Sequence, residues 1–104
     1  MSNESEKSIE QYLVKRAKAV GWLCFKFVSP NNRGVPDRIV ILPDGETVYI
    51  EVKRMTGTLS ALQQRMIKKI QDQRARVWVV WSREQIDARI ENWELDRMNA
   101  EIAS

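Results

Sequence analysis

Residues 37–53, DRIVILPDGETVYIEVK, decide the fold. Two runs within this stretch, 38–42 and 47–52, are rich in β-branched and aromatic residues, which predicts two strands. The turn sequence Pro43-Asp44-Gly45 separates them. Strands joined by so few residues pair antiparallel, because a parallel pair needs a crossover of a dozen or more residues. The stretch is therefore predicted to form a β-hairpin.

The register of this hairpin decides which side chains meet across it. If residue 42 pairs with residue 47, Arg38 lies opposite Glu51, and Asp37 lies one residue from that position. A slip or bulge of one residue then brings Asp37 and Glu51 face to face. Two carboxylates in that arrangement repel each other and destabilise a sheet, unless a divalent cation removes the repulsion. The hairpin is therefore a candidate metal site.

A lysine accompanies these two acids. Glu51 and Lys53 are two residues apart on a strand, so both side chains project from one face. By themselves they are typical of a salt bridge on the solvent face of a half-buried strand. Asp37, which follows a loop rich in glycine and proline, favours a catalytic interpretation. A metal held by carboxylates polarises a phosphodiester, and an ammonium group stabilises the negative charge that develops on the phosphate.

The rest of the chain alternates helical and strand patterns around the hairpin. Apolar residues recur at helical spacing before Gly21, and Ser60-x-x-Gln63 and Ser82-x-x-Gln85 match the capping box that begins many helices. Further apolar runs predict a strand on each side of the hairpin. The expected elements are helix 5–20, strand 22–28, loop 29–36, strands 38–42 and 47–52, a helix from Ser60, strand 77–81 and a last helix from Ser82.

This order, α-β-β-β-α-β-α, predicts an α/β fold. The first three strands should form an antiparallel meander, and the helix before the fourth strand lets that strand join in parallel. The result is a mixed sheet flanked by helices. No repeat or change of composition marks a boundary, so residues 1–104 are expected to form one domain.

The residue types present narrow the chemistry. The chain has no histidine, which excludes histidine-dependent triads and histidine-ligated zinc, so a catalytic metal must have oxygen ligands, as Mg²⁺ and Mn²⁺ prefer. The single cysteine, Cys24, excludes an internal disulfide and fits a reducing cytoplasm. No apolar run approaches the ~20 residues that span a bilayer, so we expect no membrane association.

Charge is distributed unevenly along the chain. Residues 1–76 contain 14 Lys/Arg and 8 Asp/Glu, whereas residues 77–104 contain 3 and 6. A basic body suits a polyanion, although many small basic proteins bind none. The acidic last helix has a narrow apolar stripe that includes Trp93, a pattern that often packs against a partner. We therefore expect a homodimer formed through this helix, which keeps its negative charge away from DNA.

The motifs resemble those of a known family. Gly34-Val-Pro-Asp37 followed by Glu51-Val-Lys53 resembles the PD-(D/E)xK nuclease superfamily, and residues 27–63, FVSPNNRGVPDRIVILPDGETVYIEVKRMTGTLSALQ, are similar to the VRR-NUC family. The resemblance extends over about residues 5–85 and implies a restriction-endonuclease-like fold with Mg²⁺- or Mn²⁺-dependent DNA nuclease activity. The similarity to free-standing phage and bacterial members implies a homodimer that acts on branched DNA, such as four-way junctions, or on flaps.

The same resemblance implies roles for individual residues. Asp37, Glu51 and the backbone carbonyl of Val52 would be metal ligands, and Lys53 would be the catalytic lysine. Gln63 matches a glutamine that the family places near the active site. The capping box gives Gln63 a second role at the start of a helix, and the two roles are compatible.

A glutamate of the first helix would complete the metal site by the same resemblance. Glu6 and Glu10 are four residues apart and therefore lie on one helical face. Glu10 is favoured, because it precedes the apolar pair Leu13 and Val14. The alternative for both, and especially for Glu6, is a solvated first turn stabilised by the helix dipole.

The sequence therefore predicts a metal-dependent DNA endonuclease that is selective for branched DNA and works as a homodimer. Basic residues around the proposed site are expected to contact phosphates, with ordinary solubility charge as the alternative: Lys26, Arg33, Arg38 and Arg54. Two other classes of protein stay open, a DNA-binding module without catalysis and a dimeric interaction protein. The intact set of two acids and a lysine argues against the first of these.

Overall fold

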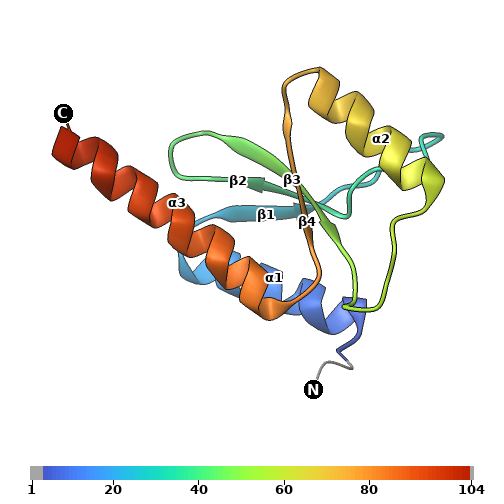
Figure 1. Cartoon of the computed structure of the whole chain (residues 1–104), viewed down its shortest axis with the longest axis horizontal. Helices are drawn as coiled ribbons and strands as arrows, with labels where there is room; N and C mark the ends of the chain where they lie inside the picture. The colour runs from blue at the N-terminus through green and yellow to red at the C-terminus, as the bar shows by residue number, and fades with distance from the viewer. Residues whose placement is uncertain (1–3, 104) are drawn as a thin grey trace.

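The computed structural model describes residues 4–103. Its elements follow the predicted order (Figure 1): α1 (Glu6–Ala19), β1 (Leu23–Lys26), β2 (Arg38–Ile41), β3 (Thr47–Val52), α2 (Ala61–Asp72), β4 (Arg76–Val80) and α3 (Arg83–Ala103). The first two strands are shorter than predicted, the third has the predicted bounds, and the fourth begins and ends one residue earlier. Within the described part of the chain, no helix is long and apolar enough to cross a membrane.

The four strands form one mixed sheet in the order β1-β2-β3-β4. The β1–β2 and β2–β3 pairs are antiparallel, and β3–β4 is parallel. α2 makes the crossover between β3 and β4 that a parallel pair requires. The predicted meander with one added parallel strand is confirmed.

The predicted register of the hairpin is wrong by one residue. Arg38 lies opposite Ile50 rather than Glu51. Continuing this register by one residue places Asp37 opposite Glu51. The protein therefore adopts the register with a one-residue slip, which brings Asp37 and Glu51 face to face.

The length of the hairpin loop causes this register. Leu42 N–H donates to the carbonyl of Glu46 at 2.8 Å, so the loop has three residues, 43–45, rather than four. The Gly45 N–H donates back to the Leu42 carbonyl at 2.8 Å. Three-residue hairpin loops usually end in a residue with positive φ, and Gly45 has a φ of 88°. A glycine adopts this conformation without a steric penalty.

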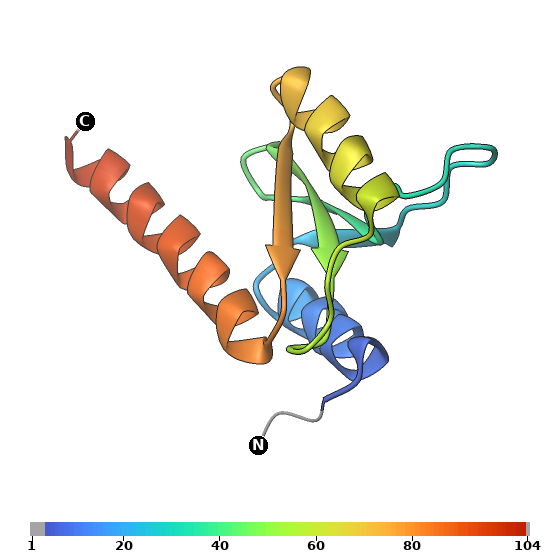
Figure 2. The ribbon, with the colours of Figure 1, turned by 45° about the vertical axis from the view of Figure 1, so that its right-hand side comes forward.

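The two faces of the sheet have different coverings. Alternate strand residues, among them Val48, Ile50 and Val52, pack in one buried cluster with the apolar faces of α1 and α3. Strand alternation directs Glu51 and Lys53 to the other face, where Gln63 of α2 contacts Glu51. Figure 2 shows α2 and α3 on opposite sides of the sheet. Glu51, which points away from the main core, is thus covered by α2 rather than by water.

Side-chain caps fix the start of each helix. Ser60 and Gln63 form the predicted capping box at the start of α2. At the start of α3, Ser82 Oγ accepts from Gln85 N–H at 3.1 Å, but the Gln85 side chain accepts from the N–H of Trp81 rather than that of Ser82. Both motifs therefore begin helices, and only the first is a reciprocal box.

Trp93 is partly buried and packs against the core of its own chain, while its predicted role at a homodimer interface stays a prediction. Its ring lies edge-on to that of Trp22, with 5.5 Å between the centroids, and it packs against the main core. The apolar residues that α3 leaves exposed come later, in the half that extends away from the sheet in Figure 1: Leu95, Met98 and Ile102.

Replacing Trp93 by alanine should therefore destabilise each chain. We expect Trp93→Ala to lower the free energy of unfolding by about 2–3 kcal/mol, somewhat less than a fully buried tryptophan would cost. Urea unfolding at several protein concentrations measures this. The loss of stability should not depend on protein concentration. A loss that vanishes at high protein concentration would indicate instead that Trp93 lies in an interface between two chains.

Candidate active site

The hairpin holds Asp37 at the end of β2, beside the last residues of β3. Asp37 Oδ2 accepts a hydrogen bond from the Val52 N–H at 2.9 Å. The Asp37 carbonyl accepts from the Phe27 N–H at 2.9 Å, which ties the residue to the strand on its other side. Both neighbours in the sheet thus fix the position of this carboxylate.

Glu51 is a buried carboxylate with an unmatched oxygen. Its side chain is 2% exposed, and its Oε1 atom has no hydrogen-bond partner within residues 4–103. Burial, and next the charge of Asp37, raise the pKa of Glu51 to about 8, while the charge of Lys53 opposes the shift. A buried acid beside a second acid, with one oxygen unpaired, is a site that a cation would complete.

Asp37 shares this unfavourable setting. Burial is the largest cause that raises the pKa of its carboxyl, and the hydrogen bond from Val52 opposes it. The negative charge of Glu10 raises this pKa further. The two carboxylates are therefore hard oxygen donors that a divalent cation would relieve of their repulsion.

Lys53 lies where the strand pattern placed it. Its Nζ is 4.0 Å from Glu51 Oε2, and its side chain is 12% exposed. The Lys53 N–H donates to the carbonyl of Val80 at 2.9 Å, which fixes the backbone just beyond β3. A nearly buried ammonium group beside the acids supplies one fixed positive charge at the site.

Gln63 makes a contact that suits each of the two roles that the sequence left open. Its side-chain oxygen accepts from the Ser60 N–H at 2.9 Å, as the capping box requires. Its Nε2 donates to Glu51 Oε2 at 3.2 Å. One amide thus joins the start of α2 to the acid on β3, and its orientation is fixed from both ends.

The acids of α1 are not gathered with Asp37 and Glu51. Glu10 Oε2 accepts from Arg38 Nε at 2.7 Å and from Lys26 Nζ at 3.4 Å. Glu6 is exposed, and its charge contributes to the raised pKa values of both site carboxyls. Over residues 4–103, no three acidic or cysteine side chains lie at metal-binding spacing. Glu10 as a ligand stays a prediction that requires it to leave Arg38.

The four basic residues expected at the site differ in availability. Arg38 is paired with Glu10, and only 20% of its side chain is exposed. Lys26 makes the longer contact with the same acid and is 60% exposed. Arg33 and Arg54 are exposed. The structure thus leaves Arg33 and Arg54 more available to a phosphate than Arg38.

An open hollow beside the site was not expected from the sequence. It lies between the 28–35 loop and the first turn of α2, and its wall includes Phe27, Val35 and Leu62. The signal that could have indicated it is Gly34. A side chain at Gly34 would come within 3.0 Å of the Leu62 carbonyl, so the glycine marks where the loop and α2 meet.

Comparisons with known proteins point to one family. The family model for the VRR-NUC domain matches residues 1–84. A solved structure described as a VRR_NUC domain is similar with a TM-score of 0.78 and 31% identity, and the match covers 85% of this chain and 97% of that one. "Putative nuclease p44" of Acyrthosiphon pisum secondary endosymbiont phage 1 is 50% identical over 48 residues, which are 46% of this chain. The matched segment spans 52% of that curated relative, about half its length.

The raised pKa of Glu51 predicts how stability depends on pH. The folded protein holds this proton more tightly than an ordinary glutamate with a pKa of 4.5. Without metal, the free energy of unfolding should therefore fall as pH rises from 4.5 to about 8. The variant Glu51→Gln, which keeps the shape and cannot titrate, should show a smaller fall in urea unfolding across the same range.

Adding Mg²⁺ or Mn²⁺ in the same measurement tests the cation site directly. The ions should raise the stability of the unmodified protein more at alkaline than at acidic pH, because a carboxylate ligand must lose its proton before it binds. Glu51→Gln should respond weakly at every pH. An equal response of both proteins would contradict a site at Glu51.

Proposed function

The chain belongs to the VRR-NUC family and carries a nuclease domain of that type, and from this premise we propose that it is a divalent-metal-dependent endonuclease that hydrolyses phosphodiester bonds in DNA. The observation that carries the proposal is the buried Glu51 carboxylate, with one unpaired oxygen, opposite Asp37 and beside Lys53. A purely structural role for these residues would leave a buried acid unmatched, which is costly.

Asp37 and Glu51 would hold the metal, with the Val52 carbonyl as a further oxygen ligand implied by the family. Mg²⁺ or Mn²⁺, when bound, supplies Lewis-acid polarisation of the phosphodiester. The protein's own contribution is to hold the two carboxylates still. Val52 N–H holds Asp37, and Gln63 holds Glu51.

Lys53 would act on the reacting phosphate. Its ammonium group is nearly buried, so water screens its charge less than it screens an exposed lysine. The ammonium can orient the attacking water and neutralise negative charge as it develops on the phosphate oxygens. Arg33 and Arg54, both exposed, would bind flanking phosphates and give sequence-independent, salt-dependent affinity.

We further propose that the enzyme is a homodimer that acts on branched or flapped DNA, in the cytoplasm of a bacterial or phage-infected cell. The exposed apolar residues of the outer half of α3 support the dimer: Leu95, Met98 and Ile102. They recur on one helical face, in the half of α3 that extends away from the sheet (Figure 1). Two sites fixed at one spacing would favour a branched substrate over a linear one.

Cleavage assays test the nuclease. The protein is incubated with four-way junctions, flaps and linear duplexes in Mg²⁺, Mn²⁺ or EDTA. We expect metal-dependent cutting, fastest on branched DNA, and a loss of at least ~100-fold in Lys53→Ala, because a fixed charge acts on the developing phosphate charge. Lys15→Ala, which changes an exposed lysine of α1, should retain full activity.

The outcomes of this assay separate the classes of function. Binding without cutting in any metal would indicate a DNA-binding module. Neither binding nor cutting would indicate an interaction protein. Cutting that persists in EDTA would contradict metal dependence, and equal rates on all DNAs would contradict branch selectivity.

The dimer is tested by light scattering of the whole chain. The unmodified protein should have twice the chain mass of 12.2 kDa, and the double variant Leu95→Ser with Met98→Ser should have the mass of one chain. Point substitutions are needed, because deleting all of α3 would remove Ile86, Ile90 and Trp93 from the core. Single-chain mass for the unmodified protein would overturn this part of the proposal.

A further inference from the structure

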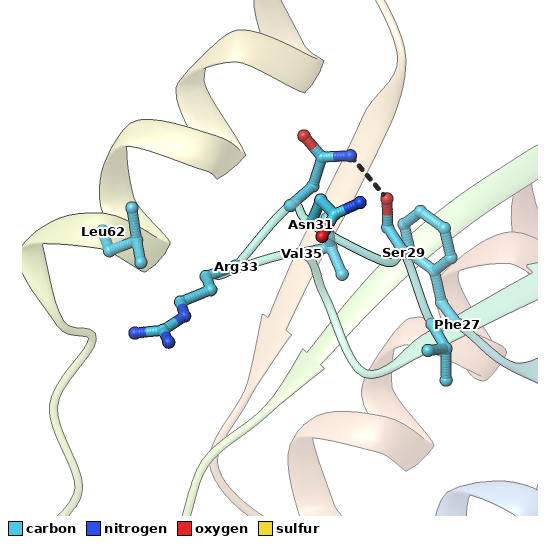
Figure 3. A pocket seen from close by; sticks show the side chains of 8 residues that line it. Phe27, Ser29, Asn31, Arg33, Val35 and Leu62 are labelled. Carbon is cyan, nitrogen blue, oxygen red and sulfur yellow. Dashed lines mark hydrogen bonds between the residues drawn. The ribbon is translucent and has the colours of Figure 1, made fainter.

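The hollow beside the active site is large and open enough to admit part of a ligand. Its volume is about 780 Å³, within the ~300–1,000 Å³ typical of ligand pockets. Figure 3 shows Phe27 and Leu62 on opposite sides of it, with Arg33 extending from the loop toward the side where Leu62 lies. Apolar and polar side chains therefore both line the space.

The loop that bounds the hollow has a defined conformation. Asn32 N–H donates to the Ser29 carbonyl at 3.1 Å, and the Asn32 side chain donates to Ser29 Oγ at 3.0 Å. Asn31 has a φ of 67°, as the third residue of a type II turn requires. Gly34 then brings the loop against Leu62 of α2. The hollow is therefore preformed and does not depend on a ligand to shape it.

Two residues that line the hollow are linked to the candidate active site. Leu62 directly precedes Gln63, whose side chain contacts Glu51. Phe27 donates its N–H to the carbonyl of Asp37. The backbone of Asp37 thus contacts a residue that lines the hollow, and Glu51 contacts the chain neighbour of another. A DNA strand with a phosphate at the carboxylates would place an adjacent nucleotide beside this space.

The chemistry of the hollow fits a nucleobase. The wall exposes apolar surface, since Val28 is 70% and Leu62 37% exposed. Within the part of the chain that the structure describes, the side chains of Asn31 and Arg33 have no hydrogen-bond or ion-pair partner. A base has apolar faces and a polar edge, which match the wall and an amide, and Arg33 matches its phosphate. A paired base cannot enter, because its faces are stacked in the duplex.

We propose that this hollow binds one unpaired nucleotide next to the scissile phosphate. Its base would lie against Phe27, Val35 and Leu62, Asn31 would contact the base edge, and Arg33 would contact the phosphate. This inference rests on the proposed DNA nuclease function and adds a determinant of specificity to it. Selectivity for flaps and branches would then arise within each subunit, from the need for an unpaired base.

Binding in EDTA, where no metal-dependent cutting occurs, tests the proposal separately from catalysis. Fluorescence anisotropy compares three DNAs of one sequence: a duplex with a one-nucleotide flap, the same flap with an abasic nucleotide, and a fully paired duplex. The unmodified protein should bind the flap about tenfold or more tightly than its abasic counterpart, the size expected for burying and stacking one base. 2-Aminopurine in the flap should change its fluorescence on binding.

Two variants separate the contribution of the apolar wall of the hollow to DNA binding from that of Arg33. Leu62→Ala should remove the preference for the base and leave affinity for abasic DNA within about twofold. Arg33→Ala should weaken binding to all three DNAs alike and lower the salt dependence by about one phosphate contact. Leu23→Ala is the matched control, because Leu23 is an exposed leucine of β1 outside the hollow. Thermal unfolding checks that each variant is folded.

Equal affinity of the unmodified protein for the flap and its abasic counterpart would overturn the proposal, as would a base preference retained in Leu62→Ala. A change of molecular mass in Leu62→Ala without an effect on DNA binding would instead assign the hollow to a second copy of the chain. Absence of cleavage in any metal would refute the nuclease function and leave the base preference measurable.

Discussion

The three-residue loop between Leu42 and Glu46 is the constraint on which the site depends. Side chains alternate along a strand, so a shift of one residue in pairing exchanges every neighbour across the hairpin. With this loop, the apolar residues of β3 face α1 and α3 while Glu51 faces α2, and Asp37 becomes its cross-strand neighbour. A four-residue loop would place Arg38 opposite Glu51, and these two residues would form an ordinary ion pair.

The cost of this arrangement is a buried acid with one oxygen that has no hydrogen-bond partner among the described residues. Burial and the nearby carboxylate raise the pKa of Glu51 far above its usual value, so the metal-free fold is least favourable where the acid is ionised. The main core lies on the opposite face of the sheet and supplies the stability that offsets this. Because the core and the site lie on opposite faces of the sheet, the fold tolerates a buried carboxylate that lacks a partner when no cation is bound.

Local patterns predicted most of the fold, because their causes are local. Capping residues begin α2 and α3, and strand alternation places Glu51 and Lys53 on one face. The details that the sequence did not predict are the loop length and contacts between residues far apart in the chain. The loop length depends on the positive φ of Gly45, and Trp93 is partly buried because it packs against Trp22 of its own chain. The pairing of Glu10 with Arg38 joins a helix to a strand, and no sequence spacing reports such a contact.

Gln63 couples the folding of the first turn of α2 to the position of the Glu51 carboxylate. Its amide oxygen closes the first turn of α2, and its amide nitrogen holds Glu51. Fraying of that turn would release the carboxylate, and because coupling between two sites is reciprocal, any ligand that orients Glu51 also protects the turn from fraying. The same fraying would displace Leu62 and open the hollow. A substrate that holds these groups together would thereby rigidify the part of the fold that surrounds it.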